Sequence, residues 1–248
     1  MPTLIEMRLK ATWAVQEDTR QLHGLACALF EGEWPGHSGQ EKAFSVWPLR
    51  AVPDGSVDEW LWRTAWLPDG PVPSAAAAAD ALRVGHVSCA VTESTQRRVT
   101  HAQLAVGPSA NEVAVSFGSP TYFSQNGADT VLPDPRLIVG SWRRRWNSSL
   151  ASKEDPLAIE DGAWRDMHRA LRLAAFDLRT ERRDSGHGRD RAGFTGSAIL
   201  RLERSAPPLA HAIFGTLARF AEYCGTGAQT THGFGATMTS QVGGNRSG

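Results

Sequence analysis

His37 and Lys42 are the first residues in the chain whose types and spacing could carry out acid–base chemistry. His37 lies in EGEWPGHSGQE (31–41), whose glycines and proline predict a loop, and a loop histidine is free to enter a cleft. Imidazole can give or take a proton near neutral pH, and a lysine five residues further on supplies a fixed positive charge beside a reacting phosphate. A lone loop histidine is more often simply exposed to solvent, so the pair needs independent support.

A second candidate is the glycine-rich stretch GTGAQTTHGFG (225–235). Its glycines allow positive φ angles and close approach of the backbone, so that successive amides could face a phosphate. It is not a Walker A loop, because no Gly-Lys-Ser/Thr follows, and it is not a dinucleotide fingerprint, because it precedes a strand. A tight turn is the alternative interpretation.

Three consecutive arginines, Arg143, Arg144 and Arg145, form a third candidate. On a helix Ile138, Trp142 and Trp146 would share one face, which predicts that they belong to the core. The arginines must then fan across the exposed side. Phosphate binding and a plain solvated surface are equally compatible with that placement.

Missing motifs and composition exclude several other classes. HExxH, paired CxxC, GxSxG and carboxylates at metal-ligand spacing are absent, which favours a metal-independent mechanism without a small-molecule cofactor. The chain has 9 basic and 12 acidic residues up to position 108, and 17 basic and 14 acidic residues after it. The net positive charge of the second half favours an anionic partner. With no long apolar run and no recognisable signal peptide, we expect a cytoplasmic protein without a membrane partner.

The first 108 residues are expected to fold in the order β-α-β-β-α-β, the ferredoxin-like order of many RNA-binding domains. TLIEMRLKATW (3–13) alternates apolar and polar residues and predicts a strand, and Asp18 could cap a helix over 18–30. The other expected elements are strands at 42–49 and 57–67, a helix at 74–83 and a strand at 84–94.

Residues 109–248 repeat this order after a polar passage. A strand is expected at 110–117, and Asp134 and Pro135 are favoured residues at the start of a helix over 134–147. A short helix near 160–172, a hairpin of 173–182 and 193–202, a helix at 207–224 and a last strand at 233–240 complete the unit. The sequence therefore predicts an α+β protein of two tandem ferredoxin-like (RRM-like) domains, 1–108 and 109–248, with a C-terminal glycine-rich loop.

Several stretches, all in the same order, carry a resemblance to a known family. They are KAFSVWPL (42–49), VAVSFGSPTYF (113–123), LPDPRLIVGSWRRRWN (132–147), GFTGSAILRL (193–202) and LARFAEYCGTGAQTTHGFG (217–235). They resemble the second strand, the centre and the C-terminal signature of the CRISPR repeat-RNA processing endoribonucleases, which belong to the RAMP superfamily. The C-terminal block is the specific part of the match.

The resemblance implies an endoribonuclease that cuts CRISPR repeat RNA (pre-crRNA) into crRNAs without a metal. It also implies effector-complex subunits as further partners. The 2′-hydroxyl before the cut would attack the adjacent phosphate and leave a 2′,3′-cyclic phosphate and a 5′-hydroxyl. His37 lies where family members often have a histidine and would act as general base or general acid. Lys42 matches a basic residue near the second strand and would stabilise the developing phosphate charge.

One departure from the family concerns the first helix, where members often carry a tyrosine. This chain has no tyrosine before Tyr122. Cys27 lies at the expected place, and His23 lies one turn earlier on the same side. His23 is therefore either a second proton-transfer group or a histidine that packs the helix.

The resemblance also implies RNA contacts. Arg143, Arg144 and Arg145 would grip the duplex stem of a repeat hairpin through its backbone. The residues of the glycine-rich stretch expected to contact RNA are Gly225, Gly227, Gln229, His232, Gly233 and Gly235.

Two other functions are compatible with the sequence. A catalytically inactive RAMP-type subunit that only holds crRNA in an effector complex would tolerate His37→Ala. An unrelated RNA-binding protein with two ferredoxin-like domains is disfavoured, because neither half shows the aromatic-rich RNP1 strand that stacks bases.

Overall fold

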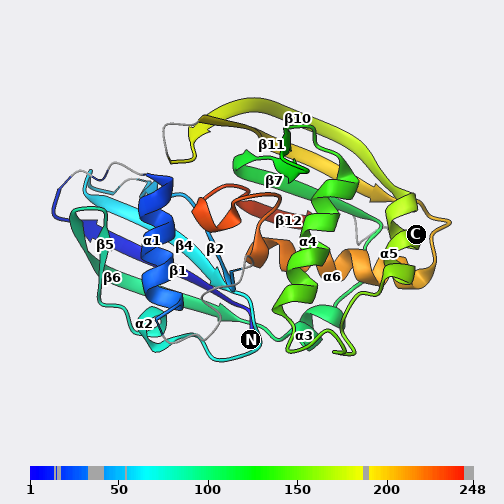
Figure 1. Cartoon of the computed structure of the whole chain (residues 1–248), viewed down its shortest axis with the longest axis horizontal. Helices are drawn as coiled ribbons and strands as arrows, with labels where there is room; N and C mark the ends of the chain where they lie inside the picture. The colour runs from blue at the N-terminus through cyan, green and yellow to red at the C-terminus, as the bar shows by residue number, and fades with distance from the viewer. Residues whose placement is uncertain (14, 16–17, 33–41, 54, 187–189, 243–248) are drawn as a thin grey trace.

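The computed structural model describes residues 1–13, 15, 18–32, 42–53, 55–186 and 190–242. Within them the chain forms two main antiparallel sheets, each covered by helices (Figure 1). The two sheets come from successive parts of the chain, and the predicted α+β fold of tandem ferredoxin-like units is confirmed. The division after residue 108 stays a prediction.

The first sheet has the strand order β2-β4-β1-β6-β5, and β3 pairs with β4. Strand β1 lies in its middle and alternates buried and exposed residues toward its end, as expected of a strand with one face against a core. Helix α1 covers one face, and its N-cap Asp18 accepts a hydrogen bond from the Arg20 amide at 2.8 Å. The elements are β1 (Thr3–Ala11), α1 (Thr19–Phe30), β2 (Phe44–Val46), β3 (Arg50–Ala51), β4 (Glu59–Trp66), α2 (Ser74–Ala77), β5 (Ala81–Val84) and β6 (Val87–Arg98).

The predicted helix over 74–83 is wrong beyond its first turn. Helix α2 ends at Ala77, and residues 81–84 form β5, with Leu82 and Val84 buried against the sheet. Alanines supply helix propensity but no apolar face, so burial of the two larger side chains decides the local structure. The predicted strand over 84–94 is likewise divided, because the chain turns at Gly85 and His86 before β6 begins.

The second sheet has the strand order β10-β11-β7-β12, which is the ferredoxin-like arrangement of four strands. Asp134 caps α4 by accepting from the Arg136 amide at 2.8 Å, and Pro135 occupies the first helical position, as predicted. The last strand begins at residue 237 rather than 233, because the residues before it belong to the glycine-rich turn. The elements are α3 (His101–Ala105), β7 (Glu112–Thr121), β8 (Phe123–Gln125), β9 (Ala128–Thr130), α4 (Pro135–Ser149), α5 (Asp161–Ala170), β10 (Leu171–Asp184), β11 (Asp190–Leu202), α6 (Pro208–Cys224), the 3-10 turn η1 (Thr230–His232) and β12 (Thr237–Gln241).

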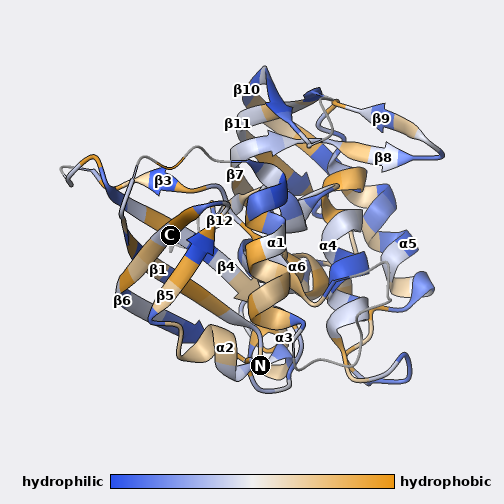
Figure 2. Ribbon diagram, turned by 60° about the vertical axis from the view of Figure 1, so that its left-hand side comes forward, coloured by the Kyte–Doolittle hydropathy of each residue, from blue (hydrophilic) through white to orange (hydrophobic). Residues whose placement is uncertain are grey.

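The buried side chains form two large clusters, and hydrophobic residues line the strands and helices that enclose them (Figure 2). Trp142 and Trp146 are 0% and 1% exposed, which confirms that this face of α4 belongs to the core. The cluster around them also includes Leu4, Ala65 and Leu67 of the first sheet region. The two ferredoxin-like units therefore share part of one apolar core.

Candidate functional site

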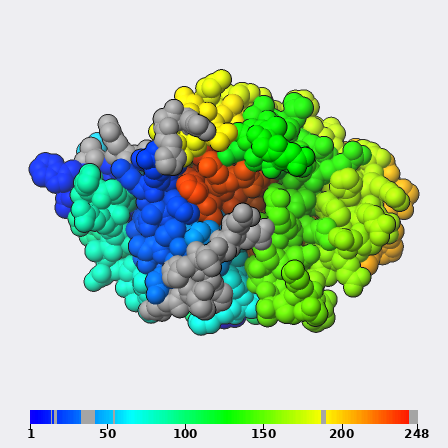
Figure 3. Space-filling model, viewed as in Figure 1, coloured from blue at the N-terminus to red at the C-terminus, as the bar shows by residue number. Residues whose placement is uncertain are grey.

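The glycine-rich stretch crosses to the first unit and ends against α1. Figures 1 and 3 show this orange-red segment between α1 (blue) and α4 (green). There the imidazole rings of His23 on α1 and His232 in η1 are stacked, with ring centroids 3.8 Å apart and an interplanar angle of 7°. The two rings lie on different units, so the seam between the units is a place where acid–base side chains meet. We call this region the α1–η1 seam.

The orientation of the His23 ring is fixed by its hydrogen bonds. Its Nδ1 lies 3.0 Å from the Thr231 carbonyl oxygen, which can only accept, so Nδ1 carries the proton. In the neutral ring, Nε2 then has the lone pair, and the Cys27 Sγ lies 3.5 Å from it as a weak donor. His23 is therefore a half-buried imidazole whose basic nitrogen is directed along α1.

His232 is held in its neutral form. Burial, together with the adjacent His23, lowers the pKa of His232 to about 4. Its Nδ1 lies 3.0 Å from the Thr231 hydroxyl oxygen. At neutral pH this ring can therefore act as a hydrogen-bonding and stacking group but not as a cation for phosphate.

Lys42 lies beside the end of α1, where its ammonium forms an ion pair with Glu31. The side chains are only 23% and 15% exposed, so water screens the pair poorly. Burial, with the nearby Glu31 as a further cause, raises the pKa of the Cys27 thiol to about 11, so Cys27 is not a thiolate. His23, Cys27 and Glu31 follow one another on one face of α1, and Lys42 adjoins the last of them.

His37 lies outside the described residues. The stretch that contains it runs between Glu31 and Lys42, and these two residues are paired with each other at the end of α1. Its two flanks are therefore close together beside α1.

The amides of the glycine-rich stretch are used within the protein. Those of Thr226 and Ala228 donate to the carbonyls of Gly235 and Tyr122 at 2.9 and 2.8 Å, and that of Gly227 donates to the Ser141 hydroxyl at 3.1 Å. The expectation that successive amides here face a phosphate is therefore wrong for these three positions. The stretch is a cross-linked turn that positions η1.

The glycines are needed for this turn. Gly225, Gly227, Gly233 and Gly235 all have positive φ angles, between 66° and 84°. Gln229 also lies in the left-handed region, at φ 52°, and its side-chain oxygen accepts from the Tyr122 hydroxyl at 2.7 Å. These residues shape the backbone that carries His232 to α1.

The three arginines of α4 have three different environments. Arg143 donates to the Ile159 carbonyl at 2.8 Å and pairs with Asp161 at 2.6 Å, whereas Arg144 is exposed. Arg145 reaches across to the first unit and donates to the carbonyls of Lys42 at 2.7 Å and Phe44 at 2.8 Å. Its guanidinium thus fixes the start of β2 beside the seam, and only Arg144 presents an exposed side chain of the kind that the sequence predicts.

Arg183 is a residue at the seam that the sequence reasoning did not single out. It lies on β10, with its guanidinium carbon 5.9 Å from the centre of the Phe234 ring and Nη1 3.4 Å from the Gly233 carbonyl oxygen. Burial lowers the pKa of Arg183 to about 10, so it remains a cation at neutral pH. A run of arginines in the sequence gave no sign of which one would be buried against the glycine-rich turn.

Within the described part of the chain, no three or more histidine, cysteine, aspartate or glutamate side chains are grouped so that they could hold a metal ion. Among the same residues, no helix is long and apolar enough to cross a membrane.

The fold and the seam define a class of proteins: two tandem ferredoxin-like units that meet across a glycine-rich turn, with imidazoles where they meet. Comparisons with known proteins identify the family within this class. The family described as CRISPR-associated endoribonuclease Cas6 matches residues 115–237. Over this stretch, which is just under half of its length, the chain is similar to this family.

Relatives support this assignment over different parts of the chain. The CRISPR-associated endoribonucleases Cas6 of two Mycobacterium tuberculosis strains are each 30% identical over 171 residues, which cover 67% of this chain. The match spans only about half of these relatives, 52% of their length. The solved structure of a Cas6 product complex is 27% identical in sequence and has a TM-score of 0.82. The match covers 97% of this chain and 100% of the chain in that structure. Thermus thermophilus Cas6, also 27% identical, covers 97% and 98% with a TM-score of 0.71.

Proposed function

We propose that this protein is an endoribonuclease that cleaves CRISPR repeat RNA into crRNAs. The match to the Cas6 family and the similarity to a Cas6 product complex support the class of reaction. The observation that carries the proposal to particular residues is the α1–η1 seam, where His23 stacks on His232 of the glycine-rich turn. The paired residues Glu31 and Lys42, which flank the stretch containing His37, lie at the end of the same helix.

The proposed reaction is an internal transesterification without a metal. The 2′-oxygen before the cut forms a bond to the adjacent phosphorus, and the bond from phosphorus to the 5′-oxygen of the next nucleotide breaks. A general base takes the 2′-hydroxyl proton, and a general acid gives a proton to the leaving 5′-oxygen. The products are a 2′,3′-cyclic phosphate and a 5′-hydroxyl.

His37 is the proposed general base or acid, a role that contributes about 10²–10⁴ in rate. His23 is the second candidate for proton transfer, and Nε2 is its available nitrogen because Nδ1 is bound to the Thr231 carbonyl. Lys42 would stabilise the charge on the phosphate. Because Glu31 neutralises Lys42 in the free protein, the substrate phosphate has to replace that carboxylate.

The proposed RNA surface is the seam together with the adjoining exposed face of α4, where Arg144 lies. The glycine-rich residues support this surface by shaping the backbone rather than by binding phosphate through the amides already described. Effector-complex subunits are proposed as further partners on the basis of the similarity to the Cas6 family alone.

The first experiment is cleavage of repeat RNA from the neighbouring CRISPR array, in EDTA, by the wild type and by His37→Ala. We expect the wild type to cleave, a single 2′-deoxy substitution before the cut to block cleavage, and His37→Ala to lose about 10²-fold or more in rate. His86→Ala is the matched control, since His86 is an exposed histidine in the turn between β5 and β6.

Other outcomes would change the assignment. Cleavage that persists in His37→Ala but stops with the 2′-deoxy substrate would move the proton-transfer role toward His23. Cleavage of the 2′-deoxy substrate would exclude 2′-hydroxyl attack. Tight binding without any cleavage by the wild type would instead favour the RAMP-type subunit that only holds crRNA.

A further inference from the structure

A furrow runs along α4 outside the α1–η1 seam. Two adjoining cavities form it, one of about 810 Å³ and one of about 270 Å³. Gly140, Arg144 and Trp164 line both cavities, so the two are parts of one depression. The smaller cavity also includes Gly227 and Ala228 of the glycine-rich turn, which connects the furrow to the segment that carries His232.

An aromatic ring forms the common wall of this furrow. Trp164 on α5 faces Gly140 on α4, and a Cβ atom at position 140 would lie 3.5 Å from the ring. The absence of a side chain at this point of α4 lets the indole pack directly against the helix. The Arg143 guanidinium lies 5.4 Å from the ring centre. Because the Ile159 carbonyl and Asp161 hold this guanidinium in place, it helps to fix the position of the ring.

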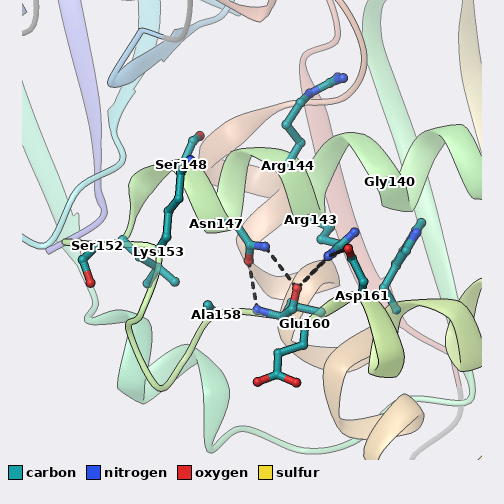
Figure 4. A pocket seen from close by; sticks show the side chains of 13 residues that line it. Gly140, Arg143, Arg144, Asn147, Ser148, Ser152, Lys153, Ala158, Glu160 and Asp161 are labelled. Carbon is teal, nitrogen blue, oxygen red and sulfur yellow. Dashed lines mark hydrogen bonds and ion pairs between the residues drawn. The ribbon is translucent and has the colours of Figure 1, made fainter.

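Cations are distributed along the furrow rather than collected at one point. Arg136 lines the smaller cavity, Lys153 lines the larger, and Arg144 lies between them. Of the two acidic residues at the larger cavity, Asp161 is already paired with Arg143. Figure 4 shows Arg143 turned toward Asp161, while the Arg144 side chain points away from that pair.

We propose that this furrow binds a single-stranded segment of RNA flanking the repeat hairpin, with one base stacked against Trp164. This inference rests on the proposed function. A concave site of this size admits an unpaired base but not a duplex, and stacking on an aromatic ring beside spaced cations is how proteins hold single strands. Continuity with the glycine-rich turn makes it the path for RNA leaving the seam.

The test compares the affinities of two RNAs that both carry a 2′-deoxy substitution at the cut, so that no product forms. One is the hairpin alone, and the other is the same hairpin with its single-stranded flanks; versions with only the 5′ or only the 3′ flank identify the strand. The measured quantity is the ratio of the affinity for the flanked RNA to that for the bare hairpin.

We expect Trp164→Ala to lower this ratio by about 5- to 100-fold, which corresponds to the loss of one base–aromatic stack. Trp164→Phe should retain most of it. Gly140→Leu, whose side chain would start in contact with the indole and displace it, should lower the ratio as Trp164→Ala does. Trp13→Ala is the matched control, because Trp13 is 76% exposed and remote from the furrow in the fold.

An unchanged ratio in both Trp164→Ala and Gly140→Leu would overturn the proposal. So would an equal loss of affinity for the bare hairpin and the flanked RNA. This result is independent of catalysis: a wild-type protein that binds the flanked RNA through Trp164 but never cleaves unmodified RNA would refute the proposed endoribonuclease and retain the furrow.

Discussion

At the scale of single residues, the seam combines two imidazoles in different states. The His23 ring is bound through Nδ1 and keeps a basic Nε2, whereas His232 is stacked on it and stays neutral. A cationic His232 would have to lie directly against a neighbouring ring that can also be protonated. The stack therefore favours the neutral form of His232 in the free protein.

The depressed pKa of His232 makes stability depend on pH. The folded value is about 4 and the unfolded value is about 6.5, so the unfolded chain binds the proton first as the pH falls. The contribution is fully present above about pH 6.5 and is lost progressively toward pH 4. His232→Phe keeps a ring in the stack but cannot take up a proton. We expect the free energy of unfolding of this variant to fall by about 2 kcal/mol less than that of the wild type between pH 7.5 and pH 4.5.

Urea unfolding at the two pH values measures this difference. Burial also lowers the pKa of His101, but that residue contributes equally in both proteins and cancels. His86→Phe serves as the exposed control. An identical pH dependence in the wild type and His232→Phe would show that His232 is not held neutral by the fold.

Neighbouring residues of one type illustrate how much of the site the sequence could predict. The tryptophan spacing correctly placed one face of α4 in the core, because helical periodicity is a local property. The separate fates of Arg143, Arg144 and Arg145 depend on Asp161, on solvent and on the carbonyl of Lys42, which no local pattern reveals. For the same reason the stacking of His23 on His232 could not be predicted, although both residues were candidates.

At the scale of elements, the glycine-rich turn is defined by its close backbone contacts. A Cβ at Gly235 would lie 1.9 Å from the Thr226 carbonyl oxygen, and the residue has a φ of 66°. We expect Gly235→Ala to lower the free energy of unfolding by about 3 kcal/mol or more, because steric overlap adds to backbone strain.

Gly127→Ala provides the matched comparison for this prediction. Gly127 has a φ of 80° in the hairpin between β8 and β9, but a Cβ there would meet nothing within 4 Å. Its cost should be about 1 kcal/mol, which is the backbone strain alone. Equal effects of the two substitutions in denaturant unfolding would refute the close packing of the turn.

The elements themselves were largely predictable from periodicity and capping. Strands with one buried face alternate, and α1 and α4 begin at their predicted aspartate caps. The largest error fell at 74–98, where alanine propensity gave way to the burial of Leu82 and Val84 in a sheet. Sheet pairing is a non-local interaction that a propensity scale does not contain.

At the scale of the whole molecule, polar contacts join the two units at the seam. Arg145 of α4 donates to the carbonyls of Lys42 and Phe44, and the Ser45 hydroxyl donates to the Tyr223 carbonyl. We expect Arg145→Met to lower the free energy of unfolding by about 2–3 kcal/mol, because two carbonyls lose charged donors.

Arg144→Met is the control for Arg145→Met. Because Arg144 is exposed, we expect its replacement to change the free energy of unfolding by less than about 0.5 kcal/mol. Thermal or urea unfolding of the two variants decides the point. If Arg145→Met were as stable as Arg144→Met, the contacts between α4 and β2 would contribute nothing to holding the units together.

The seam also has a consequence for the order in which the chain is made. The donors that fix β2 come from Arg145, and the carbonyl that binds His23 comes from Thr231, so α1 and β2 emerge from the ribosome long before either contact can form. At about 5–20 residues per second, the interval between residues 42 and 231 is on the order of 10–40 seconds. The first unit therefore emerges from the ribosome before the contacts of the seam can form. A chain that ends before η1 would lack the Thr231 carbonyl that binds His23.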